Sequence, residues 1–220
     1  MSMTLHHCMS ARSLRPLWTL EELGLDYELV MHPFPPRVMN KSYLGINVLG
    51  TVPAFVHGDV FMTESSAISQ YLADLHPEGG LSVDKTDPMY GEYLNALHYG
   101  EATLTFPQTL VLRYKMFEKP ERRQPQVAED YANWFLARLR RAEAIVSERP
   151  YFCGERFTVA DISVGYALLL GESIGLHTQY PEHVARYWSG LKQRAGLQRA
   201  LEAEKNAARS QGLSTKSPMS

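Results

Sequence analysis

The sequence predicts an α/β N-terminal domain followed by an all-α, helical C-terminal domain. Up to residue 76, short β-like runs alternate with helical patterns, whereas beyond residue 86 nearly every apolar pattern has helical spacing. Between them the segment PEGGLSVDKT is rich in turn-forming and polar residues, which is typical of a linker. The expected division is a first domain at 1–77, a linker at 78–86, a helical domain at 87–208 and a disordered tail at 209–220.

The first domain begins with a β-α-β unit. Residues 4–7 form a candidate strand, residues 12–23 place leucines at helical spacing, Gly24 marks the helix end, and residues 27–31 resume as a strand. The connection is long enough for the two strands to lie parallel. The elements expected next are a short helix near 39–44, strands at 53–56 and 60–62, and a helix at 64–76. This order predicts a mixed sheet with helices packed on it.

The second domain contains long stretches of helical periodicity. Pro107 lies inside the first of these stretches and is expected to kink or divide that helix. The expected helical ranges are 87–118, 125–148, 159–174, 181–194 and 197–208.

Composition and charge argue against several classes of protein. Apolar residues make up 45% of the chain and charged residues 21%, which is globular composition, and the formal net charge is −2. We therefore expect no nucleic-acid partner. The absence of a long apolar run predicts no membrane partner, and the start of the sequence lacks the pattern of a secretory signal. The scarcity of cysteines favours a reducing, cytoplasmic location. Cys8 and Cys153 are too few for a disulfide scaffold, and the histidines show no metal-ligand spacing, so no metal is expected.

The Val52-Pro53 step stands at the head of a predicted edge strand. A trans proline can begin such a strand, because its missing N–H faces outward. A cis peptide would instead leave the N–H and C=O of Val52 free to pair with an extended, peptide-like ligand. From the residues alone both conformations remain open.

The stretch Thr63-Glu64-Ser65-Ser66 precedes an apolar helical pattern and therefore opens a helix. The unpaired N–H groups at such a helix start suit a carboxylate, and Ser65 adds a hydroxyl donor. Glu64 could hold an ammonium group, so the pair matches the head group of an α-amino acid. The alternative is an ordinary helix start with Thr63 as the N-cap.

Another helix start, at Thr158, has a structural explanation. Thr158 as N-cap and Asp161 three residues later form a capping box, flanked by Phe157 and Ile162 as a hydrophobic staple. Asp161 is therefore interpreted as a cap rather than as a catalytic acid. Its replacement by alanine is expected to lower stability by about 0.5–2 kcal/mol, as for a lost cap.

Cys8, Ser10 and Ser13 lie between the first strand and the first helix. Thiols and hydroxyls at a strand-to-helix turn can meet a substrate, since the helix N-terminus stabilises an anion there. Capping of the helix by Ser10 or Ser13, with Cys8 simply buried, is the alternative.

In their order these segments resemble the glutathione transferase family over nearly the whole chain. The matching motifs are WTLEELGLDYELV, NVLGTVPAF, TESSAISQYLAD and GERFTVADIS. The resemblance implies a thioredoxin-like N-terminal domain, a helical C-terminal domain and a homodimer. It also implies glutathione as cosubstrate and conjugation of its thiolate to hydrophobic electrophiles, a detoxifying activity.

The resemblance also implies roles for individual residues. Val52 before a cis Pro53 would pair with the cysteine of glutathione, and Glu64 and Ser65 would hold its γ-glutamyl head group. Lys41 and Arg37 would meet the glycyl carboxylate. The implied wall of the electrophile pocket consists of Tyr99, Phe106, Leu110 and Tyr114.

The catalytic position follows by spacing from the family pattern. In its serine and cysteine branches the thiol-facing residue lies about fourteen residues before the helix-ending glycine, and 24 − 10 = 14 selects Ser10. Many bacterial relatives carry their serine at the position of Ala11, so Ser13 and the backbone of Arg12 are rivals. No tyrosine occupies this stretch, which favours the serine/cysteine branch.

Two other functions remain open. A glutathione-dependent disulfide reductase or peroxidase would use a cysteine near the first strand, and Cys8 is the one there. A non-catalytic protein that binds glutathione or another ligand would keep the scaffold without turnover.

Overall fold

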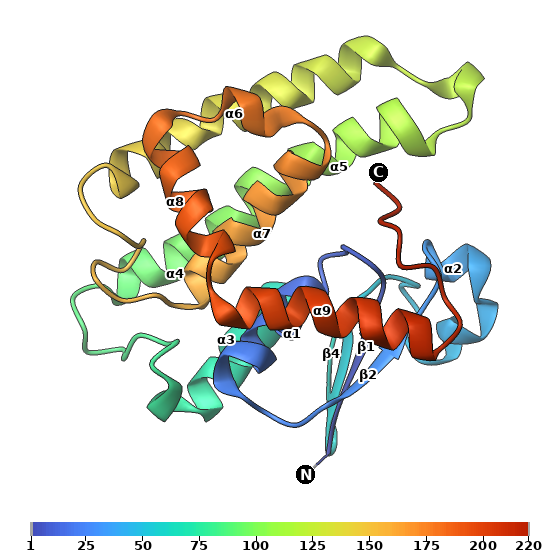
Figure 1. Ribbon diagram of the computed structural model, residues 1–220, viewed down its shortest axis with the longest axis horizontal. Coiled ribbons are helices and arrows are strands. Elements are labelled where there is room, and N and C mark those ends of the chain that lie inside the picture. The colour runs from blue at the N-terminus through green and yellow to red at the C-terminus, as the bar shows by residue number, and fades with distance from the viewer. Residues whose placement is uncertain (1, 220) are drawn as a thin grey trace. The chain divides into compact units, whose positions relative to one another are not determined.

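The computed structural model describes residues 2–219 and divides them into two compact units (Figure 1). The first unit consists of residues 2–79 and 193–218, and the second contains residues 80–192. Met1 and Ser220, the outer ends of the predicted first domain and of the predicted tail, lie outside the described residues.

The first unit contains a four-stranded mixed sheet, which the sequence predicts, and its strands lie in the order β2-β1-β3-β4. The strands are β1 (Met3–His7), β2 (Glu28–Met31), β3 (Ala54–His57) and β4 (Val60–Met62). β1 pairs parallel with β2 and antiparallel with β3, which in turn pairs antiparallel with β4. A two-residue turn joins β3 to β4, where Gly58 has a φ of 58° that favours glycine.

Four α-helices belong to this unit. They are α1 (Leu14–Leu23), α2 (Pro36–Met39), α3 (Ser65–Leu75) and α9 (Ala195–Ser210), with short 3-10 helices at Lys41–Gly45 and Pro77–Gly79. α1 ends as predicted, because Gly24 adopts the left-handed conformation at φ 64° and its N–H donates to the carbonyl of Leu20. α1 and α3 pack against each other.

Helix α9 packs on α1 and beside β2, so it groups with the sheet rather than with the helices that precede it (Figure 1). The predicted range of the helical domain, 87–208, includes this segment, because periodicity identifies a helix but not its packing partner. α9 continues to Ser210, into the range predicted as a disordered tail. The Gln211 amide then accepts from the N–H of Met31 and donates to the carbonyl of Leu29, both at 2.8 Å.

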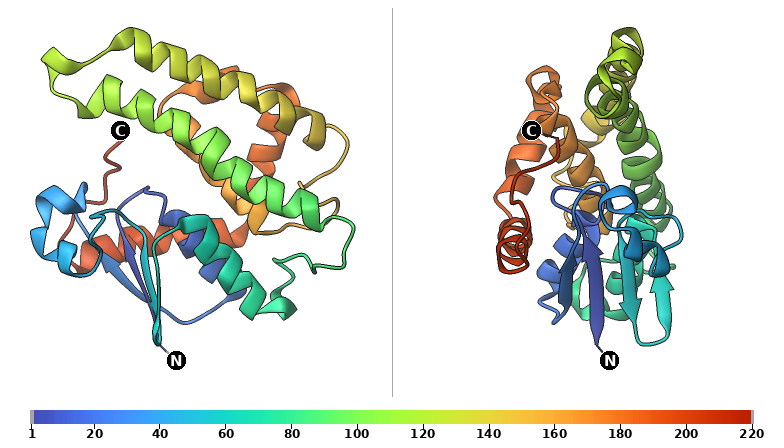
Figure 2. Two further views of the ribbon diagram at one scale, coloured as in Figure 1. Left: turned by 180° about the vertical axis from the view of Figure 1, so that it is seen from behind. Right: turned by 90° about the vertical axis from the view of Figure 1, so that its right-hand side faces the viewer.

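The second unit is helical, as predicted, and Figure 2 shows its long antiparallel helices. Its α-helices are α4 (Tyr90–His98), α5 (Phe106–Leu112), α6 (Pro125–Val146), α7 (Val159–Ser173) and α8 (Glu182–Lys192). Short 3-10 helices lie at Pro120–Arg122 and Leu176–Gln179. Most of α7 is buried, because its residues are apolar on nearly all sides and the other helices surround it.

The first helical stretch of this unit is divided near Pro107, as expected. π-helical turns at Tyr99–Thr105 and Arg113–Phe117 flank α5, and Pro107 lies in its first turn. A proline there needs no intrahelical donor. The sequence does not predict these π-helical turns. They change which side chains lie on the same face of the helical stretch from Tyr90 to Phe117.

Within this unit, Gly100 is required by close packing. A Cβ atom added there would lie 2.5 Å from the carbonyl carbon of Ser163 in α7. We expect Gly100→Ala to lower the free energy of unfolding by about 1–3 kcal/mol, measured by urea denaturation. The control is Gly91→Ala in α4, where the space is open; it should raise that free energy by about 0.5–1 kcal/mol. Equal effects of the two changes would contradict the packing explanation.

Among residues 2–219, none of the helices has both the length and the apolar character that crossing a membrane requires.

Candidate functional site

Four chain segments meet at one edge of the sheet because of the strand directions. β1 and β2 are parallel and end together at His7 and Met31. β3 runs the opposite way and begins at this edge with Ala54, opposite His6. β4 is antiparallel to β3 and ends at this edge with Met62. The β1–α1 loop, the start of the β2–α2 loop, the residues before β3 and the N-terminus of α3 therefore form what we call the site edge.

The peptide between Val52 and Pro53 is cis, which confirms this part of the prediction. Pro53 is buried and Val52 is partly exposed. The preceding carbonyl of Thr51 accepts hydrogen bonds from the Tyr43 hydroxyl and from the Asn47 side-chain amide, each at 2.8 Å. These two bonds fix the carbonyl of Thr51, so the backbone of the adjoining Val52 is held in place at the site edge.

The N-terminus of α3 brings a carboxylate and a hydroxyl to the same edge. The helix begins at Ser65, so Glu64 rather than Thr63 occupies the N-cap position, and the side chain of Glu64 is exposed. Ser65 is buried, and its hydroxyl oxygen accepts a hydrogen bond from Nη1 of Arg15 at 3.2 Å. The hydroxyl keeps its own proton for a ligand, and the first-turn N–H groups add further donors.

Arg15 is a further candidate site residue that no local sequence pattern indicates. It lies in α1 and is completely buried, which is rare for a guanidinium. Its partner Ser65 is fifty residues away in the sequence, so no local pattern indicates the pairing. A cation behind Ser65 adds positive potential at the place where a carboxylate would bind.

The β1–α1 loop holds the four candidates for the thiol-facing group. Ser10 is partly exposed and adopts a φ of 57°, in the left-handed region. Arg12 is also partly exposed. Ser13 is completely buried just before α1, and its hydroxyl has no hydrogen-bond partner among residues 2–219. Cys8 is also fully buried, and burial raises the pKa of its thiol to about 12. Exposure thus favours Ser10 over Ser13, and burial keeps Cys8 protonated.

A buried histidine pair lies behind the loop and was also not predicted. Nδ1 of His6 is 2.9 Å from Nε2 of His32, the first residue after β2. The Asn40 amide donates to Nδ1 of His32, so Nε2 of His32 carries the proton that is shared with His6. Burial lowers the pKa of His32 to about 4, with a further contribution from nearby His6. The pair is therefore neutral at pH 7 and connects β1 to the β2–α2 loop.

The two cations proposed for the glycyl carboxylate lie farther along that loop. Arg37 is in α2 and Lys41 begins the following 3-10 helix. Both side chains are exposed. They are therefore accessible to an anionic group.

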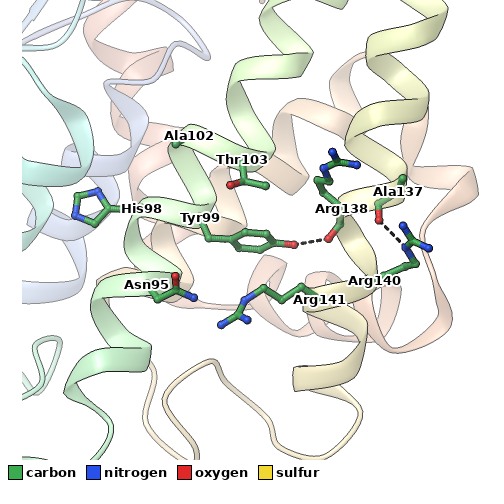
Figure 3. Close-up of a pocket in the computed structure, with 9 residues that line it drawn as sticks. All are labelled: Asn95, His98, Tyr99, Ala102, Thr103, Ala137, Arg138, Arg140 and Arg141. Atoms are coloured by element: carbon green, nitrogen blue, oxygen red, sulfur yellow. Dashed lines mark hydrogen bonds between the residues drawn. The ribbon is translucent and has the colours of Figure 1, made fainter.

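The predicted electrophile wall is not brought together as one set. Tyr99 is buried and lines a cavity of about 590 Å³ in the second unit (Figure 3). Its hydroxyl donates to the carbonyl of Arg138 at 2.6 Å. Arg140 and Arg141 also line this cavity, which gives it a cationic wall unlike that of a pocket for apolar molecules. The other three predicted wall residues are not among its lining.

Those other three residues form an accessible apolar stripe. Phe106 and Leu110 lie one turn apart on α5, and Tyr114 follows in the next π-helical turn. Phe106 is 55% exposed and the other two are partly exposed. Exposure of this size on a large aromatic side chain is compatible with contact to an apolar ligand.

The capping box at the start of α7 is present. Thr158 accepts from the N–H of Ala160, and Asp161 accepts from the N–H of Thr158 at 2.9 Å. Asp161 also accepts from the N–H of Phe152 and from the hydroxyl of Tyr187. All of these partners are structural, which agrees with the interpretation of Asp161 as a cap.

Within the described part of the chain, no group of three or more His, Cys, Asp or Glu side chains is arranged to hold a metal ion. The site edge offers hydroxyl, amide and guanidinium groups instead. These groups suit a zwitterionic, peptide-like molecule with free carboxylates.

Comparison with known proteins identifies the relatives of this arrangement. Residues 1–74 match the family model of the glutathione S-transferase N-terminal domain. The protein named glutathione S-transferase GstA of Escherichia coli O157:H7 is 29% identical over 212 residues, which cover 92% of this chain and 98% of that protein.

Solved structures of glutathione transferases are also similar to this chain. A glutathione transferase from Methylococcus capsulatus superimposes with a TM-score of 0.76 at 26% identity, covering 92% of this chain and 98% of that one. A sphingomonad glutathione S-transferase complexed with glutathione gives a TM-score of 0.80 at 25% identity, covering 91% and 98%. The mixed sheet with its helices is thus a thioredoxin-like domain.

Proposed function

We propose that this chain, a member of the glutathione S-transferase family, conjugates the thiolate of glutathione to hydrophobic electrophiles. The observation that carries the proposal is the gathering of a free backbone at Val52, the start of α3 at Glu64 and Ser65, and a hydroxyl at Ser10 along the site edge. Each matches one part of glutathione.

Partners are available for all three residues of glutathione. The γ-glutamyl carboxylate would bind the α3 N-terminus and the Ser65 hydroxyl, with the buried Arg15 behind it. Its ammonium group would pair with exposed Glu64. The backbone of the cysteinyl residue would pair with Val52, and Arg37 and Lys41 would approach the glycyl carboxylate.

The chemical step requires a thiolate. A free thiol has a pKa near 8.5, and lowering it by about two units requires roughly 2.7 kcal/mol of differential stabilisation. We propose that the Ser10 hydroxyl donates to the sulfur and that the N-terminal dipole of α1 adds to its stabilisation. This assigns the protein to the serine/cysteine branch, with Ser13 and the Arg12 backbone as rivals. The stripe of Phe106, Leu110 and Tyr114 is the proposed wall for the electrophile.

Binding of the head group can be tested separately from turnover. We expect Glu64→Ala and Ser65→Ala each to weaken glutathione binding by about tenfold, the effect of one lost charge-assisted hydrogen bond. Isothermal titration calorimetry measures the affinity, and thermal unfolding controls for stability. Asp59→Ala, in the exposed β3–β4 turn, is the matched surface control. Unchanged affinity in both Glu64 and Ser65 variants would remove the α3 N-terminus from the site.

A disulfide reductase or peroxidase is the alternative enzyme. It would depend on Cys8, but that thiol is fully buried and burial raises its pKa to about 12. We expect Cys8→Ser to leave conjugation of a chlorinated nitroaromatic intact and wild type to reduce a glutathione mixed disulfide no faster than the uncatalysed reaction. Rapid, Cys8-dependent reduction would favour the alternative. Glutathione binding without either reaction would indicate a non-catalytic binding protein.

Family membership alone supports three further proposals: a homodimer, a cytoplasmic location and a role in detoxification. Sedimentation velocity tests the first of these, since a dimer has twice the 24.9 kDa mass of the chain.

A further inference from the structure

A carboxylate from α9 contacts the loop that carries Ser10. Glu204 lies in α9 and is only 2% exposed. Its Oε2 atom accepts a hydrogen bond from Nε2 of His7 at 2.8 Å and another from the backbone N–H of Ser10 at 2.9 Å. A single carboxylate oxygen of Glu204 thus bonds both His7, the last residue of β1, and Ser10, which follows three residues later. Glu204 lies nearly two hundred residues after them in the sequence.

α9 is attached firmly on both sides of Glu204. Before the helix, Arg194 bonds both carboxylate oxygens of Glu22 in α1, at 2.8 and 2.9 Å. After it, the Gln211 amide bonds the main chain of β2. Figure 1 shows α9 in front of α1, on which it packs. The carboxylate of Glu204 is therefore presented to the loop from a rigid support.

The bond to Ser10 fixes an uncommon backbone conformation. Ser10 has a φ of 57°, a region that residues other than glycine seldom occupy because Cβ meets the neighbouring carbonyl. A hydrogen bond to a carboxylate is stronger than one between neutral groups, and this one is partly buried, with its carboxylate only 2% exposed. Loss of this bond would remove one restraint on the backbone of Ser10, and a change of φ there would turn its side chain in another direction.

We propose that Glu204 is a positioning residue that, together with His7, holds the backbone of Ser10 so that the Ser10 hydroxyl is directed at the thiol of glutathione. The proposal rests on the function proposed above. Glu204 acts through Ser10, whose N–H it occupies, and not through contact with the reacting atoms.

The test compares Glu204→Ala with Arg194→Ala. Both remove an anchor of α9, but the paired bonds of Arg194 go to Glu22 in α1, whereas Glu204 bonds the loop itself. We expect Glu204→Ala to lower kcat at pH 7 about tenfold or more, with the KM for glutathione within about twofold. The pKa of bound glutathione should rise by about one unit. Arg194→Ala should lower the melting temperature while leaving kcat and the thiol pKa unchanged.

A conservative variant separates geometry from charge. Glu204→Gln keeps one carbonyl oxygen that can accept from the Ser10 N–H, so it should restore a large part of the kcat lost in Glu204→Ala. Equal changes of kcat and thiol pKa in Glu204→Ala and Arg194→Ala would overturn the proposal, because Glu204 would then be only a structural anchor. Wild-type kcat and thiol pKa in Glu204→Ala would overturn it as well.

A measurement without substrate distinguishes failure of this proposal from failure of the proposed function. In the free protein, hydrogen exchange of the Ser10 amide should be slow in wild type and about tenfold faster in Glu204→Ala, because the hydrogen bond that protects this amide is lost. Unchanged exchange overturns the positioning role whether or not the protein is a transferase. Suppose that wild type forms no conjugate but exchange of the Ser10 amide is faster in Glu204→Ala. The proposed transferase function would then be wrong, whereas the restraint of the Ser10 backbone by Glu204 would be confirmed.

Discussion

Replacing Ser10 by alanine is expected to raise the pKa of bound glutathione by about one to two units and to lower turnover at pH 7 by about tenfold or more. The reason is the loss of one hydrogen bond to a charged sulfur, worth about 1.5–3 kcal/mol. The affinity for glutathione should change little, because the head group is held elsewhere. The measurement is thiolate absorbance of the complex as a function of pH, together with kcat.

Ser13→Ala is the matched control for this experiment. The Ser13 hydroxyl is fully buried and has no hydrogen-bond partner within residues 2–219, so its removal should leave the thiol pKa unchanged. If Ser13→Ala shifts the titration and Ser10→Ala does not, the hydroxyl that stabilises the thiolate has been wrongly chosen. A shift in neither variant would leave the helix dipole and the Arg12 backbone as the source of stabilisation.

The Asp161→Ala substitution should lower the free energy of unfolding by about 3–5 kcal/mol, more than the loss of a helix cap. The carboxylate accepts from the N–H groups of Phe152 and Thr158 and from the Tyr187 hydroxyl. All of these donors would stay buried without a partner. Thr158→Ala is the control, since it removes the bond to the N–H of Ala160 and should cost about 0.5–2 kcal/mol. Urea denaturation provides both values, and equal losses would contradict the shared role of Asp161.

The contribution of Asp161 to the free energy of unfolding is also expected to depend on pH. Burial raises its pKa from 3.8 to about 6, so the folded state binds this proton more readily than the unfolded state does. The contribution of this group to the free energy of unfolding therefore falls as the pH rises from about 4 to about 6. Asp161→Asn should remove that part of the pH dependence, and an identical dependence in the variant would contradict it.

Features fixed by neighbouring residues could be predicted from the sequence. The capping box at Thr158 depends on residues three apart, and the C-cap at Gly24 lies within a short motif. The cis Val52-Pro53 step, by contrast, was expected only from the family resemblance, since the residues alone left both conformations open. The order of strands and helices likewise followed from local periodicity and turn residues. The mixed sheet then brings the predicted site segments to one edge.

Contacts between distant residues could not be predicted in this way. The bond between His7 and Glu204 joins residues 197 positions apart, and Arg15 reaches Ser65 across fifty. No period or motif in the sequence encodes such pairs, because packing of α9 and α3 on α1 creates them. The different environments of Tyr99 and Phe106 are a related case: Tyr99 is buried and Phe106 is 55% exposed, and the π-helical turn at Tyr99–Thr105 changes the helical period between them.

The formation of a glutathione conjugate tests the proposed function most directly. Glutathione and a chlorinated nitroaromatic are mixed with the purified chain, and the conjugate is measured as a function of glutathione concentration. We predict a rate that saturates with glutathione, exceeds the uncatalysed rate and falls in Glu64→Ala through a higher KM. A rate equal to the uncatalysed reaction at every glutathione concentration, with glutathione bound according to calorimetry, would contradict the proposal that this protein is a transferase.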